Sequence, residues 1–223
     1  MKWFLEKKDK ILLALFLAME VILYGQILTA EGKLLIWSEY ISVLLCFLFV
    51  LISFQKPLLI GGLALTLCAD FCLVVCDPIQ QLWGMVFFLG AQCLYAVLLH
   101  RQKLPRGLLA LRIGLSVAVG GVTAVILGKN TDALALVSMV YYVNLIMNLV
   151  CAFWRFRKNS LLALGFVLFI LCDTVIGLQV AAGAYLPISE DSFIHSLIFS
   201  DFHLSWFFYL PSQVFIALSG RRK

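Results

Sequence analysis

Charged residues are scarce in this chain of 223 residues, at 13%, whereas apolar residues make up 63%. A soluble globular domain usually contains about 25% charged residues. The chain therefore lacks the polar surface that would cover a soluble core. Its basic residues form short clusters between apolar runs, without a basic helix or interleaved aromatic residues. This pattern excludes a nucleic-acid-binding protein.

Patterns for disulfides and metal sites are also missing. The seven cysteines all lie inside apolar runs, and none forms a CxxC pair or has a histidine close by. We therefore interpret them as small buried side chains. His100, His195 and His203 fall in loops or at a helix end, which leaves no intramembrane histidine site and no buried Ser–His pair. We expect neither a metal nor a cofactor.

Long apolar runs are what the sequence has in abundance. About 20 apolar residues are needed to cross the hydrocarbon core as a helix. The first run follows a basic segment, as in a signal peptide, but its length and Glu20 favour a retained helix. We predict an all-α integral membrane protein in which residues 1–223 form one transmembrane domain. The predicted spans are 11–30, 34–54, 57–76, 82–100, 107–128, 132–154, 160–184 and 204–219.

The basic residues predict the orientation of these eight spans. With the N-terminus in the cytoplasm, Lys33 and Lys129 are the two basic residues outside, and the other fifteen of the 17 lie inside. This is the positive-inside distribution, and an odd number of spans would destroy it. We therefore predict two cytoplasmic termini and, in a bacterium, location in the plasma membrane. The external loop 185–203 is acidic, and we interpret it as a solvated loop, with substrate gating as the alternative.

The fifth span carries rows of small residues, in which Gly114 precedes Ala118 by four positions and Gly120 precedes Ala124 by four. Such rows allow two helix backbones to approach closely. The span has no ionisable group after Arg112. We predict that it is a packing helix.

Three ionisable residues fall at membrane depth, namely Glu20, Asp70 and Asp173. Each costs at least ~2.5 kcal/mol on insertion scales, so such residues tend to face an interior site. Asp70 and Asp173 are equally far from Pro57 and Ser160, the inner ends of their spans, and this places both about 20 Å from the cytoplasmic edge. The sequence does not indicate a partner for Glu20.

Cysteines flank Asp70 at two residues on either side, in Cys68 and Cys72. Two residues correspond to about 200° around a helix. We therefore expect both thiols to point away from the Asp70 face. This argues against an active centre made of cysteine and aspartate.

Polar side chains on three other spans share single helix faces. We predict that these faces converge with the two aspartates on one polar cavity. For the Asn and Gln residues, the alternative is interhelical hydrogen bonding that only stabilises the bundle. The faces are Gly84, Phe88, Gln92, Tyr95 and Leu99 in the fourth span, Tyr141, Asn144 and Asn148 in the sixth, and Trp206, Tyr209 and Gln213 in the eighth.

An internal regularity favours a repeat. The third and seventh spans each carry an aspartate preceded by a nearby cysteine, and the fourth and eighth each carry a mid-helix glutamine. We hypothesise that residues 1–103 and 104–223 are two four-helix halves related by an axis along the membrane normal.

Four motifs follow one another along the chain: Leu-Cys-Ala-Asp at 67–70, Phe-Leu-Gly-Ala-Gln-Cys-Leu-Tyr at 88–95, Leu-Phe-Ile-Leu-Cys-Asp at 168–173 and Tyr-Leu-Pro-Ser-Gln at 209–213. In their order and spacing they resemble the YhhN-like family of lysoplasmalogenases. The resemblance extends along nearly the whole chain. Gln92 stands where the family usually has histidine, Cys172 where it has serine and Ala69 where it has glycine.

The resemblance implies an integral membrane hydrolase that cleaves the vinyl ether bond of a lysoplasmalogen into a fatty aldehyde and a glycerophospho-alcohol. This hydrolysis requires one carboxylic acid that donates a proton and one carboxylate that orients water. We predict Asp70 and Asp173 as that catalytic pair, although the sequence does not indicate which is the acid. The predicted substrate-binding residues are Gln92, Tyr95, Tyr209, Gln213, Asn144 and Asn148.

Two other functions fit the sequence. Carboxyls at midplane and a repeat would also suit a carrier or a proton-coupled transporter of a small amphiphile. A relative of the hydrolase that binds lipid without cleaving it is the other alternative. For the hydrolase the expected partners are a lysophospholipid substrate and the bilayer, and the oligomeric state is left open.

Overall fold

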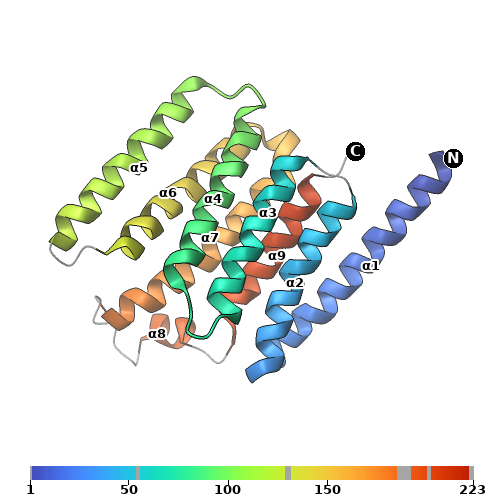
Figure 1. Ribbon diagram of the computed structural model, residues 1–223, viewed down its shortest axis with the longest axis horizontal. Coiled ribbons are helices and arrows are strands. Elements are labelled where there is room, and N and C mark those ends of the chain that lie inside the picture. The colour runs from blue at the N-terminus through green and yellow to red at the C-terminus, as the bar shows by residue number, and fades with distance from the viewer. Residues whose placement is uncertain (1, 54–55, 129–131, 185–191, 200–201, 221–223) are drawn as a thin grey trace.

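The computed structural model describes residues 2–53, 56–128, 132–184, 192–199 and 202–220. Every regular element in these ranges is helical (Figure 1). The helices are α1 (Lys2–Thr29), α2 (Gly32–Ile52), α3 (Pro57–Asp70), the π-helical segment η1 (Phe71–Val75), α4 (Gln81–His100), α5 (Arg106–Leu127), α6 (Ala133–Trp154), α7 (Phe156–Ala184), α8 (Phe193–Ile198) and α9 (Leu204–Ser219).

The helices are those of a multi-pass membrane protein. Within the described residues, seven are long and apolar enough to cross a membrane, namely α1, α2, α3 together with η1, and α4 to α7. The last predicted span coincides with α9, an apolar helix of 16 residues that is shorter than the others. The acidic residues of the predicted external loop, Glu190, Asp191 and Asp201, lie outside the described residues.

The bundle has two peripheral helices, α1 at one edge and α5 at the opposite edge (Figure 1). Between them lie α2, α3, α4, α6, α7 and α9, which bury the core. The start of α1 and the end of α9 lie at the same end of the bundle (Figure 1). The predicted start of the seventh span at residue 160 is marked by the non-helical Asn159 (φ −123°, ψ 25°), which interrupts α7.

Two glycines allow neighbouring helices to approach closely. The ring of Tyr95 in α4 lies against Gly62 of α3, where a Cβ atom would collide with it. A Cβ atom on Gly165 of α7 would lie 2.7 Å from Cγ1 of Ile216 and 3.0 Å from the carbonyl oxygen of Ser212, both in α9. The α3–α4 and α7–α9 pairs are the ones that the predicted repeat of two four-helix halves would relate. Superposition of the two halves would test that prediction.

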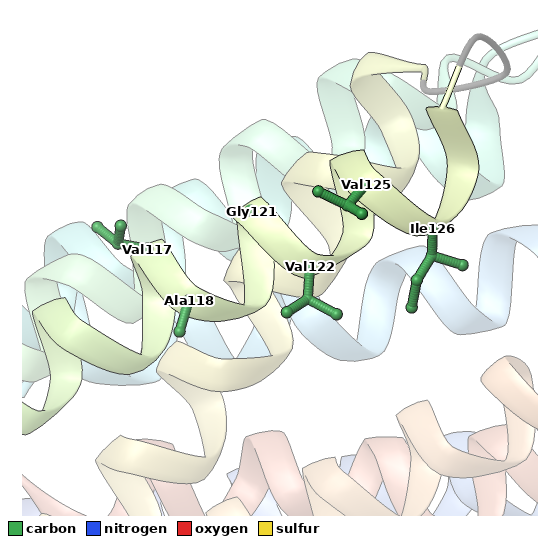
Figure 2. Close-up of a pocket in the computed structure, with 6 residues that line it drawn as sticks. All are labelled: Val117, Ala118, Gly121, Val122, Val125 and Ile126. Atoms are coloured by element: carbon green, nitrogen blue, oxygen red, sulfur yellow. The ribbon is translucent and has the colours of Figure 1, made fainter.

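The prediction that the fifth span is a packing helix holds for its contact with α6, but within the described residues most of its small residues take no part in that contact. Its glycines are not buried against another helix, since a Cβ atom on Gly114 or Gly121 would meet nothing within 4 Å. Gly120 makes an ordinary contact with Val140 of α6. Figure 2 shows a groove on α5 that only apolar residues and a glycine line, namely Val117, Ala118, Gly121, Val122, Val125 and Ile126. It offers no polar group for chemistry.

Two irregular turns lie where polar residues enter the core. The third span was predicted as one regular helix, but α3 ends at Asp70 and continues as the π-helical η1, closed by a bond from the Cys76 amide to the Phe71 carbonyl. Such π turns are frequent at functional sites. In α9, Pro211 cannot donate to the Phe207 carbonyl, and the Tyr24 hydroxyl of α1 donates to that oxygen instead (3.2 Å).

Candidate active site

Asp70 is placed at the end of α3 and points into the core, with 3% of its surface exposed. Its two carboxyl oxygens accept hydrogen bonds from the Tyr209 hydroxyl of α9, at 2.8 and 2.7 Å. Tyr209 is itself buried. Because the partners are 139 positions apart, this contact exists only once the tertiary fold brings the Tyr209 hydroxyl to the end of α3.

Asp173 lies in α7 and is half-buried. Its Oδ2 atom accepts a hydrogen bond of 2.5 Å from the Tyr141 hydroxyl of α6. At the next position of both helices, the Tyr142 and Thr174 hydroxyls are 2.8 Å apart on a more exposed face. The α6–α7 interface thus has two adjacent tyrosine contacts, of which only the first involves a carboxyl.

The rings of Tyr141 and Tyr209 belong to one aromatic cluster. Phe88 of α4 and Phe169 of α7 lie between them, and each contacts both tyrosines, with ring centroids 5.3 to 6.4 Å apart. The two phenylalanines also pack edge to face at 5.6 Å. We call these four residues the aromatic box. It connects the two Asp–Tyr pairs, and Asp70 and Asp173 are within electrostatic range of each other.

Sequence reasoning missed a third buried carboxyl, that of Glu39, which acts on Asp70 electrostatically. Glu39 of α2 is buried, with 7% of its surface exposed, and is within electrostatic range of Asp70. Its helical face carries Ser42 and Cys46, also buried. This spacing of three and four residues was a readable signal for an inward polar face.

Four more polar residues form a second cluster, which we call the Arg112 cluster: Arg112, Asn144, Asn148 and Gln92. The Arg112 guanidinium donates to Oδ1 of Asn144 (3.2 Å) and to Oδ1 of Asn148 (2.7 Å). Nδ2 of Asn148 donates to Oε1 and to the backbone oxygen of Gln92, at 2.8 and 2.9 Å. Arg112 was missed because it was counted among the cytoplasmic charges, although it lies within the predicted span 107–128.

The predicted site residues therefore do not form one group. The shared faces are confirmed, because Gln92, Tyr95, Tyr209 and Gln213 are all buried. However, within the described residues neither Tyr95 nor Gln213 forms a hydrogen bond to an aspartate, and Oε1 of Gln213 has no hydrogen-bond partner. The prediction was that these residues converge on one cavity, but the structure shows two separate hydrogen-bonded clusters. The reason is that helix periodicity predicts the face on which a residue lies but not the residue that it contacts.

Glu20 does not join the aspartates by any described hydrogen bond. Its Oε1 atom accepts a bond from the Cys46 thiol of α2 at 3.4 Å, so it lies in the α1–α2 interface. The expected orientation of the cysteines next to Asp70 holds, since Cys68 is exposed and Cys72 is half-exposed.

These features define a class: an all-helical, multi-pass membrane protein with two aspartate–tyrosine pairs in its interior. The chain belongs to the YhhN family, whose family model matches residues 34–220. Membership indicates a lysoplasmalogenase-like membrane protein and confirms the resemblance found in the sequence motifs. The match covers α2 through α9 and leaves α1 outside. No curated protein and no solved structure matches the chain.

Proposed function

We propose that the protein is an intramembrane hydrolase that cleaves the vinyl ether bond of lysoplasmalogen-like lysophospholipids. The observation that carries this proposal is the pairing of Asp70 and Asp173, from different helices, with two tyrosines of one aromatic box. Family membership supports the same reaction class. A site within the bilayer suits a substrate that is itself a lipid.

The reaction requires a proton donor and a base, and two nearby carboxyls can supply both. Burial in a medium of low dielectric constant disfavours the charged form of each carboxyl, and a second carboxylate in the same interior adds to this cost, so one of the two retains its proton. That acid protonates the vinyl carbon distant from the ether oxygen, and the adjacent carbon and oxygen share the resulting positive charge. The second carboxylate takes a proton from water as the water oxygen bonds to the cationic carbon. The hemiacetal then collapses to the aldehyde and the alcohol.

The aromatic box would stabilise the intermediate cation. Aromatic ring faces attract positive charge, by about 0.5–2 kcal/mol per contact. The tyrosine hydroxyls hold the carboxyl groups in position, and each can shift its hydrogen bond as the charge of its carboxyl changes. Asp70 and Asp173 are then the catalytic residues, and Tyr141 and Tyr209 are positioning residues.

Replacing Tyr141 with phenylalanine is expected to lower kcat by about 10–100-fold, because a hydrogen bond to a charged group contributes about 1.5–3 kcal/mol. The matched control is Tyr142→Phe, which removes the neighbouring hydroxyl and its contact with Thr174. We expect the control to retain wild-type turnover. The measurement is aldehyde release from purified protein, and equal rates for the two variants would contradict the role of Tyr141.

The direct test of function is incubation of the purified protein in detergent with a lysoplasmalogen. Formation of fatty aldehyde with many turnovers per protein supports the hydrolase. Counterflow of the lipid in liposomes without aldehyde would instead support a carrier. Binding with neither aldehyde nor counterflow would support a relative that has lost catalysis.

We further propose eight membrane crossings with both termini in the cytoplasm, which for a bacterial protein means the plasma membrane. At ~1.5 Å per residue, α9 is about 24 Å long, somewhat less than a hydrocarbon core of about 30 Å. Its burial against α7 supports a crossing all the same. A fluorescent protein fused to the C-terminus should fluoresce, and an alkaline phosphatase fused there should be inactive. The reverse pattern would contradict this topology.

A further inference from the structure

Arg112 is a buried cation without a counter-charge. Among the described side chains of α5 it is the one that is buried, with 5% of its surface exposed. Its guanidinium bonds only to neutral groups in the part of the chain that the structure describes: Asn144, Asn148 and, at 3.8 Å, the Cys151 thiol. A guanidinium does not lose its proton in a protein, so the positive charge persists.

A buried charge normally has an opposite charge as its partner, because desolvation is otherwise uncompensated. Amide oxygens compensate only part of this cost. The membrane interior increases the cost further. The charge of Arg112 thus indicates that an anion completes the cluster.

The direction of the hydrogen bonds leads to the same conclusion. Arg112 can only donate, so Asn148 must accept through Oδ1 and donate through Nδ2 to Gln92. The Gln92 side chain therefore accepts through Oε1, and its amide nitrogen is left without an acceptor. Nε of Arg112 also lacks one within the described residues. Both unsatisfied groups are donors, so the missing group is an acceptor.

We infer that the Arg112 cluster binds the phosphate diester of a lysophospholipid head group. This inference rests on the proposed function, which supplies the substrate class. A phosphate diester has one negative charge and several acceptor oxygens, which match one guanidinium and the free Gln92 amide. Asn148 lies two turns along α6 from Tyr141, a rise of about 10 Å. The two clusters therefore both contact α6 within two turns of each other, and the glycerol unit would lie between them.

The competing explanation is that Arg112 only attaches α5 to α6. Nδ2 of Asn144 also donates to the Ser116 hydroxyl of α5 at 3.3 Å, so the cluster does connect the two helices. If Arg112 is purely structural, substituting it should weaken the binding of all lipids equally. If it binds phosphate, the substitution should weaken only the binding of lipids that carry a phosphate.

The test measures binding to protein in maltoside micelles, which contain no phosphate. The probes are a 1-alkyl lysophospholipid, whose saturated ether is not cleaved, and the matching 1-alkylglycerol. We expect the wild type to prefer the phospholipid by at least about tenfold in Kd, the size expected for a hydrogen bond to a charged group. Arg112→Gln should remove this preference by weakening phospholipid binding alone. Arg106→Gln, an exposed arginine of the same helix, should retain it.

A second variant covers the case in which Arg112→Gln fails to fold. Asn144→Asp places a carboxylate beside the guanidinium and supplies the missing anion from within the protein. We expect this variant to fold, with a melting temperature at or above that of the wild type, and to lose the phospholipid preference. A folded Asn144→Asp or Arg112→Gln protein that keeps the preference would overturn the inference.

Inorganic phosphate distinguishes the two sources of the anion. We expect it to compete with the lysophospholipid only weakly, since it lacks the alkyl chain. Binding of inorganic phosphate as tight as that of the lipid would overturn the assignment to a head group. Because the ether probe is not cleaved, absence of aldehyde in the hydrolase assay would refute the proposed function without affecting this result.

Discussion

Asp70→Asn and Asp173→Asn are each expected to lower the rate of lysoplasmalogen cleavage by about 10²–10⁴-fold, the contribution typical of general acid–base catalysis. Asparagine has nearly the same shape and can still accept the tyrosine hydrogen bond through its amide oxygen. It cannot donate a carboxylic proton or take one from water. The expected effect is therefore on turnover, with folding retained. Aldehyde release per protein measures turnover, and the elution profile and melting temperature measure folding.

The matched control is Asp132→Asn. Asp132 caps α6 by accepting a bond from the Ala135 amide, and asparagine caps a helix about equally well. The Asp132→Asn substitution should therefore leave turnover unchanged. Turnover within a few-fold of the wild type in either the Asp70 or the Asp173 variant would remove the paired-carboxylate mechanism.

The double variant gives a further check. Groups that act as one unit lose most of their effect with the first substitution, so the two losses should not multiply. We expect Asp70→Asn combined with Asp173→Asn to be about as slow as the slower single variant. A product of the two single losses would instead indicate two independent contributions.

Gly165→Leu is expected to destabilise the protein by about 1–3 kcal/mol or more, the range for forcing atoms into a packed interface. Even a Cβ atom at this position would contact both the side chain and the backbone of α9. A leucine must therefore separate α7 from α9. Since α9 carries Tyr209, which bonds to Asp70, cleavage should fall together with stability.

The control for this substitution is Gly177→Leu in the same helix. A Cβ atom on Gly177 meets nothing within 4 Å, so a leucine there should be tolerated. Thermal unfolding in detergent compares the two variants. Equal melting temperatures would show that the α7–α9 contact at Gly165 is not a close one.

Much of the architecture was readable from the sequence because the membrane imposes simple rules. Apolar length gave the positions of the spans, and the predicted 204–219 coincides with α9. The helical period of 3.6 residues predicted which face of each helix points inward, and the burial of Gln92 and Tyr209 confirms it. Glu39 shows the limit of this reading, since it lies near the start of its span and was not recognised as an intramembrane carboxyl.

The pairing of side chains was not readable. Nothing local to Asp70 indicates that Tyr209 rather than Tyr95 bonds to it, and nothing local to Asp173 selects Tyr141. Arg112 is the clearest case. A basic residue near the inner end of a span counts as a cytoplasmic charge by the positive-inside rule, yet its guanidinium turns inward to Asn148.

The order of apolar runs and the spacing of polar residues thus determined the fold class and the helical faces, because these depend on backbone geometry and on hydrophobic burial. Tertiary packing decided which tyrosine meets which aspartate, that Glu39 lies within electrostatic range of Asp70, and that Gln92, Asn144 and Asn148 gather around Arg112. Those contacts depend on how helices far apart in the chain are rotated and placed against each other. That placement is set by close approaches such as Gly165 on α9, which no local pattern encodes.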